Sequence, residues 1–498
     1  MLNIKVIEGE IEKFQADVIV VNLFEGVKNP GGATGSVDTS LENIISELIE
    51  GGEFSGKLGE NLLLHTYDKL PSKRVLVVGL GKSENFSPKV IRNVSAQTSR
   101  YLRGLKVKKI ASIAHGVGIG GHEVEYCAEE IAQGLLVGLY RYDQFVKKSE
   151  VIIEEFTIVE KDSSKIPLLQ KGINQGQAIA EGVIFARDLV NTPGNHMTPT
   201  ILSERAQEMA EKNNLSMEIL NENQCAEKSM GAYLSVSRGS FEEAKFIVIE
   251  YRGNPDKSEY NLAFIGKSVT FDTGGISLKP AADMSRMKSD MAGGASVLGA
   301  INAIALLKPK INILAILPAT ENMPGSKATK PGDIVISMNG KSIEVENTDA
   351  EGRLTLADAV SYVIERNVEN IIDVATLTGA MHMALGNVRG GLFGNNQDLM
   401  ELVIKASEQA GEKFWQMPMD EEYKDFNKSD VADIKNTGGR LAGAITAAHF
   451  IGEFAAEVPW VHMDIAGMAM TEKDSGYFTK GSTGFPVCTL VKLALSME

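Results

Sequence analysis

Short apolar runs rich in β-branched residues alternate with helical stretches along most of this 498-residue chain. Such alternation is typical of βαβ units, in which helices connect the strands of a largely parallel sheet. The runs occupy residues 16–23, 73–81, 108–116 and 150–160, and then residues 244–253, 261–272, 310–320, 370–380 and 459–467. The pattern therefore predicts an α/β fold.

The chain is too long for one ordinary domain. Residues 166–192 have the pattern of one long helix, which ends where Pro193 and Gly194 act as stop signals. We predict a smaller N-terminal α/β domain over residues 1–165, a connecting helix over 166–192, and a larger C-terminal domain over 193–498 with a mixed, largely parallel sheet sandwiched by helices. Residues 291–307 are apolar nearly all round, which predicts a buried helix.

Composition excludes several classes of protein. Lys and Arg total 50 against 65 Asp and Glu, a net charge of −15 that repels polyanions, so no nucleic-acid partner is expected. The three cysteines are far apart and give no disulfide framework, which favours a reducing compartment. The first residues are acidic where a signal peptide needs an apolar core, and no apolar run approaches the ~18 residues of a membrane span. We expect a cytoplasmic protein without a membrane partner.

Two carboxylates and a guanidinium alternate in NTDAEGRL, residues 347–354. Asp349, Glu351 and Arg353 follow a hairpin, marked by its Asn339-Gly340 turn, and precede an apolar helical pattern. On an extended backbone residues i and i+2 face the same side, and two converging carboxylates repel unless a proton or cation lies between them. The alternative is structural: Asp349 caps the helix and Glu351 occupies its first turn. The motif alone leaves both open.

A second segment, residues 266–294, adds further charged residues. Lys267 and Asp272 lie at the end of an apolar strand, and Asp290 opens the predicted buried helix. The structural alternatives are a helix cap for Asp290 and an exposed surface lysine for Lys279. Open α/β sheets place their sites at strand ends, and two strand ends here offer four carboxylates, which favours a joint functional role.

Several common motifs are absent. Gly266-Lys267-Ser268 is not a phosphate-binding loop because Asn261 stands where its first glycine is needed, and Glu84 breaks the dinucleotide fingerprint after Gly79 and Gly81. None of the seven histidines lies in either acidic segment, and neither H-E-x-x-H nor G-x-S-x-G occurs. Oxygen-rich ligands suit Mg²⁺, Mn²⁺ or Zn²⁺, and bridging carboxylates suit two ions about 3.5–4 Å apart.

These segments resemble a known family. NTDAEGRL looks like the signature octapeptide of the M17 leucyl aminopeptidases, and GKSVTFDTGGISLKP with the following SDMAGG resembles their other metal-binding segment. ARDLVNTPGNHMTPT, DVATLTGA, DIKNTGGRLAGAITAA and WVHMDIAG are similar to further family blocks, so the resemblance covers most of residues 185–490.

The resemblance implies two divalent metal ions, Mn²⁺ or Zn²⁺ with Mg²⁺ and Co²⁺ as further candidates, that share Asp272 and Glu351. Asp349 would complete one site through its side chain and backbone carbonyl; Asp290 and Lys267, as a neutral amine, would complete the other. The implied catalytic residues are Lys279, facing the oxyanion, and Arg353, holding a bicarbonate ion as general base. The implied substrate-binding residues are Met287, Asn347, Thr376, Leu377, Gly379 and Ala466.

The resemblance thus implies a cytoplasmic metallo-aminopeptidase, in which a water activated by two metals releases an apolar N-terminal residue such as leucine. It also implies a homohexamer that acts on short peptides with a free N-terminus in intracellular peptide turnover. A two-metal phosphoesterase is the alternative enzyme, since the same groups suit phosphate. A catalytically inactive scaffold is the non-enzymatic alternative, and a further ligand-binding role of the N-terminal unit has no motif behind it.

Overall fold

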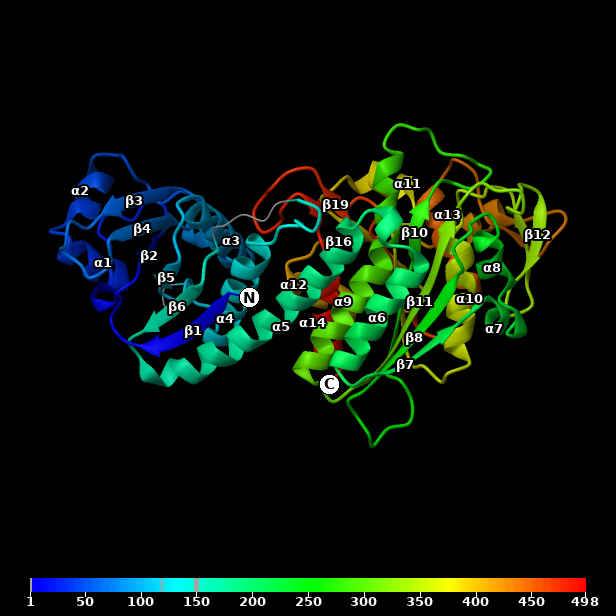
Figure 1. Cartoon of the computed structure of the whole chain (residues 1–498), viewed down its shortest axis with the longest axis horizontal. Coiled ribbons are helices and arrows are strands. Elements are labelled where there is room, and N and C mark those ends of the chain that lie inside the picture. Colours follow the sequence, from blue (N-terminus) through cyan, green and yellow to red (C-terminus); the bar gives the residue numbers. More distant parts are fainter. Residues whose placement is uncertain (1, 118–119, 147–151) are drawn as a thin grey trace. The chain divides into compact units, whose positions relative to one another are not determined.

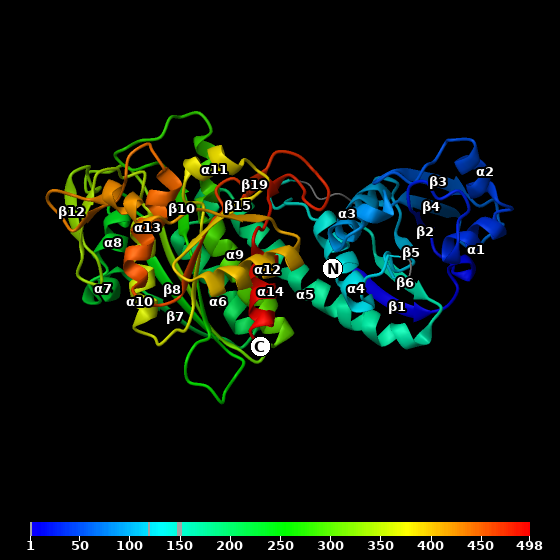
Figure 2. The same cartoon turned by 180° about the vertical axis from the view of Figure 1, so that it is seen from behind.

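A computed structural model describes residues 2–117, 120–146 and 152–498 (Figures 1 and 2). The chain forms two compact units, one of residues 1–180 with 473–479 and one of residues 181–472 with 480–498. The division falls inside helix α5 (Ile166–Asn191), the long helix that the sequence predicts. The domain boundaries at residues 165 and 192 stay predictions.

The N-terminal unit is built on one twisted sheet with strand order β1-β6-β5-β2-β4-β3. Its strands are β1 (Asn3–Glu8), β2 (Val18–Leu23), β3 (Asn61–His65), β4 (Arg74–Gly79), β5 (Lys109–Ser112) and β6 (Glu155–Glu160). All neighbouring strands are parallel except β3, which runs antiparallel to β4. The strand predicted over residues 150–160 begins in residues outside the described part of the chain. Helices α1 (Gly32–Ser40), α2 (Ile44–Glu50), α3 (Pro88–Gly104) and α4 (Val124–Gly138) accompany the sheet.

A larger mixed sheet forms the centre of the second unit, in the order β16-β15-β18-β14-β9-β11-β8-β7, with β10 also paired to β11. Its strands are β7 (Ser216–Leu220), β8 (Lys245–Arg252), β9 (Leu262–Gly266), β10 (Ser268–Asp272), β11 (Asn312–Asn322), β14 (Ile371–Ala375), β15 (Gly390–Gly394), β16 (Phe414–Gln416) and β18 (Trp460–Asp464). The central pairs β18/β14, β14/β9 and β9/β11 are parallel, whereas β15/β18, β11/β8 and β8/β7 are antiparallel. Parallel strands buried on both faces read as continuous apolar runs, as these do.

Helices cover both faces of this sheet (Figure 1). Helices α6 (Pro199–Lys212), α9 (Ala292–Leu307), α12 (Gln397–Ala410) and α14 (Val487–Ser496) pack on one side, and α8 (Gly231–Ser237), α10 (Gly352–Ile364) and α13 (Gly443–Ala455) on the other. Two shorter helices are α7 (Glu222–Glu227) and α11 (Gly379–Leu385). The predicted two-domain α/β fold, with its larger sheet sandwiched by helices, is confirmed.

Helix α9 is the apolar helix expected at the centre of the unit. With the 3₁₀ turn before it, the stretch Met284–Leu307 is long and apolar enough by length and composition to cross a membrane, contrary to the expectation that no run approaches that length. Of the apolar 18-residue window in this stretch, 89% is buried inside the fold, as in a core helix.

A small sheet positions the first acidic motif. Strands β12 (Asp333–Ile336) and β13 (Ser342–Val345) form the predicted hairpin, and β17 (Ile434–Lys435) pairs in parallel with β13. The chain leaves β13 and enters α10 seven residues later, so the motif lies in the connection between strand and helix. A two-stranded ribbon of β19 (Met470–Thr471) and β20 (Gly481–Ser482) lies further along the chain.

Candidate active site

Lys267 lies at a break between two strands that the sequence pattern runs together. β9 ends at Gly266 and β10 begins at Ser268, and both pair in parallel with β11, with a register shift between Val269 and Phe271. The backbone of Lys267 is held on both sides, since its N–H donates to the carbonyl of Val374 (3.0 Å) and its carbonyl accepts from the N–H of Gly294 (2.8 Å). The break therefore fixes a buried lysine where the central strands end.

Asp272 ends β10 and is followed by two glycines that the geometry requires. Gly274 and Gly275 have φ of +87° and +66°, in the left-handed region that favours glycine. The Gly274 N–H donates to Asp272 Oδ1 at 2.9 Å. A Cβ at Gly274 would lie 2.7 Å from Asp349 Oδ1, so a side chain there would separate the two acidic segments.

Glu351 stands at the N-cap position of α10 but makes no side-chain cap hydrogen bond. Its carboxylate instead pairs with Lys267, with Oε1 2.8 Å from Nζ. The structural alternative, with Asp349 as the cap, is therefore wrong. The extended backbone assumed for this pair is also wrong at Glu351, whose φ of −79° and ψ of −35° are helical because the helix begins there.

Asp290 belongs to the 3₁₀ helix Met284–Met291 that leads into α9. The N-cap residue of α9 is Met291 and has no side-chain cap bond, so the capping alternative for Asp290 is wrong as well. Its Oδ1 accepts hydrogen bonds from Lys267 Nζ and Thr376 Oγ1, both at 2.8 Å. Asp290 is thus turned toward the strand ends rather than toward its own helix.

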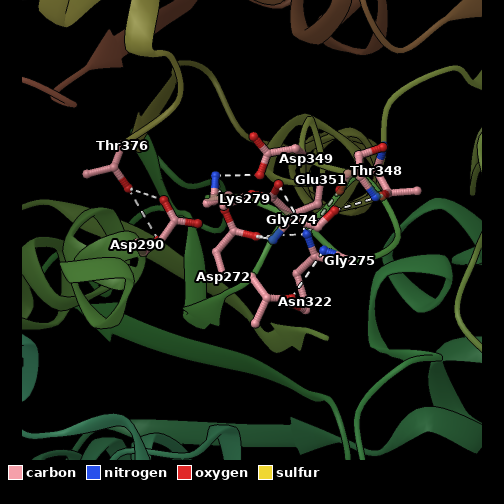
Figure 3. A network of polar contacts seen from close by, with 12 residues as sticks. Asp272, Gly274, Gly275, Lys279, Asp290, Asn322, Thr348, Asp349, Glu351 and Thr376 are labelled. Atoms are coloured by element: carbon pink, nitrogen blue, oxygen red, sulfur yellow. Dashed lines mark hydrogen bonds and ion pairs between the residues drawn. The ribbon is translucent and has the colours of Figure 1, made fainter. Parts of the chain in front are cut away.

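The three buried carboxylates of Asp272, Asp290 and Glu351 converge, each offering one oxygen within 4.8 Å of the others (Figure 3). Asp349 is not in this group, and its carboxylate contacts Lys279. Lys279 Nζ also lies 2.8 Å from Asp272 Oδ2, and the lysine side chain is 22% exposed, which rules out a freely solvated surface lysine. The structure therefore brings all six predicted acidic and lysine residues of the two segments to one place.

Burial and like charge make this cluster electrostatically unfavourable by itself. Burial, with the neighbouring Glu351, raises the pKa of Asp272 to about 6, and burial also raises the pKa of Asp290 and of Asp349. Burial acts in the same direction on Glu351, but Lys267 and Lys279 outweigh it and hold the pKa of Glu351 below its ordinary value. Four carboxylates face two ammonium groups, and divalent cations would supply the missing positive charge.

Arg353 is buried in the first turn of α10. Its Nη1 donates to the carbonyl of Asn436 at 2.7 Å, whereas its Nε is buried and has no hydrogen-bond partner among the described residues. Burial lowers the pKa of Arg353 to about 10, so the guanidinium stays charged at neutral pH. A buried guanidinium with an unused donor is a favourable place for a small planar anion.

The predicted substrate-binding residues lie on four segments. Asp464, buried at the end of β18, accepts from the N–H groups of Leu377 and Ala466 (3.2 Å each) and from Thr378 Oγ1 (2.7 Å). This carboxylate therefore ties the segment after β14 to the segment after β18. Met287 lies three residues before Asp290, Gly379 opens α11, and Asn347 Oδ1 accepts from the Asp349 N–H (2.9 Å).

Four residues that support the site were missed from the sequence. Asn322 Nδ2 donates to Asp272 Oδ1 (2.8 Å) and to the carbonyl of Thr348 (3.0 Å), which joins the two acidic segments. A Cβ at Gly352 would lie 2.7 Å from Lys267 Nζ. The others are Asn436 and Asp464. Asn322 and Asp464 are polar residues that end apolar strands, a signal that could have found them.

Family models and full-length relatives match this chain to the same family. Residues 184–491 match the catalytic domain of the cytosol aminopeptidase family, and residues 20–149 match its N-terminal domain. The probable cytosol aminopeptidase of Alkaliphilus metalliredigens (strain QYMF) is 43% identical, with 100% of both chains covered. That of Synechocystis sp. (strain ATCC 27184 / PCC 6803 / Kazusa) is 42% identical, with 97% of each chain covered.

Solved structures agree with the family models. A mutant of tomato leucine aminopeptidase superposes with a TM-score of 0.89 at 34% identity, covering 100% of this chain and 97% of that one. The bottromycin maturation enzyme BotP in complex with Mn gives a TM-score of 0.85 at 31% identity, covering 97% and 99%. Both family models and full-length relatives point to one conclusion: the chain belongs to the cytosol aminopeptidase family, M17, and is a metallo-exopeptidase.

Proposed function

We propose that this enzyme removes apolar N-terminal residues, preferentially leucine, from short peptides by means of two divalent metal ions. The observation that carries the proposal is the convergence of the buried carboxylates of Asp272, Asp290 and Glu351 within 4.8 Å of one another. Carboxylate oxygens suit Mn²⁺, Zn²⁺, Mg²⁺ and Co²⁺, and we favour Mn²⁺ or Zn²⁺.

The residues present fit such ions. Asp272 and Glu351 would be shared between the two ions, Asp349 would complete one site, and Lys267 with Asp290 the other. Lys267 could act as a ligand only as the neutral amine, whereas the carboxylates around it here outweigh its burial and raise the pKa of its ammonium. When bound, the ions would lower the pKa of a water molecule and polarise the scissile carbonyl.

Lys279 and Arg353 would then act on the substrate side. Lys279 is partly exposed and lies between Asp272 and Asp349, so its ammonium can approach the developing oxyanion and stabilise its charge. Arg353 would hold bicarbonate through its free Nε, and that anion would accept the proton of the attacking water.

Substrate preference would be set by the segments that Asp464 ties together. Thr376 and Leu377 precede α11, Gly379 opens it, and Ala466 follows β18, while Asn347 and Met287 lie near the acidic residues in the sequence. Apolar side chains at Leu377 and Met287 favour an apolar N-terminal residue. When bound, the ions would favour a substrate with a free α-amine, because a neutral amine can act as a metal ligand and an internal peptide offers none.

We also propose a cytoplasmic homohexamer that acts in intracellular peptide turnover. The names of the relatives, cytosol aminopeptidases, support the location, and the M17 resemblance supports the assembly. Light scattering coupled to gel filtration tests it: about six times the 53.7 kDa chain mass supports the hexamer.

The test of activity combines metal content with substrate choice. We expect two equivalents of metal per chain and Mn²⁺-dependent release of p-nitroaniline from leucine p-nitroanilide but not from its N-acetylated form. Hydrolysis of p-nitrophenyl phosphate instead would favour the phosphoesterase alternative. Two bound metals without cleavage of any of these substrates would favour the scaffold alternative.

A further inference from the structure

Asn436 is fully buried and follows β17 in the segment DIKNTGGRLAGAITAA. Its backbone extends the pairing of β17 with β13, because its N–H donates to the carbonyl of Glu344 at 2.9 Å. The residue is therefore fixed directly beside the connection that carries Asp349 and Glu351.

The side-chain amide of Asn436 makes all its possible hydrogen bonds with the backbone of that connection. Its Oδ1 accepts from the N–H groups of Glu346 (2.9 Å) and Asn347 (3.2 Å). Its Nδ2 donates to the carbonyls of Asn347 (2.7 Å) and Ala350 (3.2 Å). One side chain thus satisfies four backbone groups in five consecutive residues, and a buried amide with all its hydrogen bonds made restricts the backbone around it.

The same residue also reaches the anion-holding group. The carbonyl oxygen of Asn436 accepts from Arg353 Nη1 at 2.7 Å, which aligns one edge of the guanidinium, while Nε has no partner in the described part of the chain. Asn322 contacts the same connection through the carbonyl of Thr348. Asn436 is therefore the residue that links the acidic motif to the position of Arg353.

We propose that Asn436 is a positioning residue that sets the geometry of both the metal-binding carboxylates of the motif and the Arg353 guanidinium. The inference rests on the proposed two-metal function and extends it to a residue 83 positions beyond Arg353 in the sequence. It predicts that loss of the amide changes metal binding and bicarbonate dependence together, although Asn436 itself would touch neither metal nor substrate.

The test compares Asn436→Ala with Asn312→Ala, a matched control. Asn312 is also fully buried, accepts from the N–H of Asn254 and donates to the carbonyls of Asn254, Lys257 and Glu259, in a loop that holds no site residue. Both substitutions remove four side-chain hydrogen bonds to a backbone loop. Loss of stability alone would therefore affect both variants alike.

Three quantities are measured per folded chain: Mn²⁺ affinity by calorimetric titration, kcat and KM for leucine p-nitroanilide, and the bicarbonate concentration for half-maximal activity. We expect Asn436→Ala to weaken Mn²⁺ binding and lower kcat by about 10- to 100-fold each, the range typical of residues that orient metal ligands, with a smaller change in KM. The bicarbonate requirement should rise, and Asn312→Ala should match wild type in all three.

Asn436→Asp serves if the alanine variant does not fold, because aspartate keeps the size and both acceptor contacts but loses the two donors. It should show the same combined defect. Wild-type Mn²⁺ affinity and kcat in the folded variant, or equal defects in Asn436→Ala and Asn312→Ala, would overturn the proposal. Failure of wild type itself to bind Mn²⁺ or cleave the substrate would instead overturn the proposed function, so the two failures are distinguishable.

Discussion

Both units contain parallel strands, but the residues at the carboxyl ends of those strands differ between the two units. In the N-terminal unit these ends border a cavity of about 520 Å³, lined by residues such as Leu23, Leu80 and Ile113 that end or follow β2, β4 and β5. In the second unit the corresponding ends carry carboxylates and lysines that contact one another.

The buried polar groups at these strand ends differ in charge between the two units. In the N-terminal unit His115 Nδ1 is hydrogen-bonded to Asn22 Nδ2 at 2.8 Å, and burial lowers the pKa of His115 to about 4, so the pair is neutral at pH 7. In the second unit Lys267 and Glu351 stay charged because they face each other, which raises the pKa of the lysine and lowers that of the glutamate. Similar sheets can thus carry either neutral or charged buried side chains at the ends of their strands. Only the charged side chains need a partner ion.

Removal of the Glu351 carboxylate, which is proposed to bind both metals, should have the largest effect on the activity of the charged site. Glu351→Ala should lower kcat/KM by more than about 10³-fold, beyond the loss expected for one charge-stabilising donor, because a ligand of both metals is lost. Metal content and p-nitroanilide hydrolysis measure it. The control is Glu365→Ala, an exposed glutamate at the other end of the same helix. Near-normal turnover in Glu351→Ala would contradict the two-metal assignment.

Removal of the half-buried Lys279 side chain should affect chemistry more than metal binding. Lys279→Met should lower kcat by about 10²- to 10³-fold while metal remains bound, because the oxyanion loses its charged donor. Metal analysis alongside steady-state kinetics separates the two effects. Lys330→Met, which changes a lysine exposed by 68%, is the control. A pure rise in KM with unchanged kcat would argue against the role of Lys279.

The proposed role of Arg353 can be tested by varying the concentration of bicarbonate, the anion that it is proposed to hold. Arg353→Ala should lower kcat by about 10²-fold with metals still bound, because the general base is no longer held. Activity is measured against bicarbonate concentration after the anion has been removed. Wild type should recover strongly on addition and the variant weakly; identical bicarbonate curves would show that Arg353 does not hold the anion.

The smallest expected effect on activity concerns His115 in the N-terminal unit. Protonation of this residue should change the stability of the unit and leave catalysis unaffected. The pKa of His115 is lowered to about 4 in the folded state from 6.5, so the folded state binds fewer protons between these values. The contribution of neutral His115 to the free energy of unfolding is therefore present above pH 6.5. It is lost as the pH falls toward 4, by up to roughly 3 kcal/mol.

Spectroscopy can assign this acid sensitivity to one unit. Both tryptophans, Trp415 and Trp460, belong to the second unit, so their fluorescence reports on that unit, whereas far-ultraviolet circular dichroism reports on both. Urea unfolding between pH 7 and 4 should show dichroism lost before fluorescence. His115→Gln should reduce the pH dependence, and the exposed His65→Gln should not; equal pH dependence in all three proteins would refute the assignment.

Much of the fold followed from local pattern. The alternating runs predicted the central strands of both sheets but missed β1, β3, β7, β15 and β16. The Asn339-Gly340 turn predicted the β12–β13 hairpin, and the all-round apolar character of α9 predicted its burial. These features depend on residues close together in the chain, and periodicity reports them directly. The break at Lys267 was not predicted, because it arises from the register that β9 and β10 take along β11.

The residues of the candidate site also fall into two groups, those that the sequence identified and those that only the structure revealed. Asp349, Glu351, Asp272 and Asp290 stand out in sequence as carboxylates at strand and helix ends, and the family resemblance named their roles. The support from Asn322, Asn436 and Asp464 comes from distant segments through backbone hydrogen bonds, which leave no spacing pattern.

The sequence by itself determined which groups this protein can bring to a metal and to a substrate, because residue type and position at the ends of elements are written along the chain. Only the tertiary structure decided which carboxylates converge, why Asp349 pairs with Lys279 instead, and why Arg353 Nε has no partner among the residues described. Those outcomes depend on strand register and on contacts between segments far apart in sequence, where differences of an ångström separate a metal site from ordinary ion pairs.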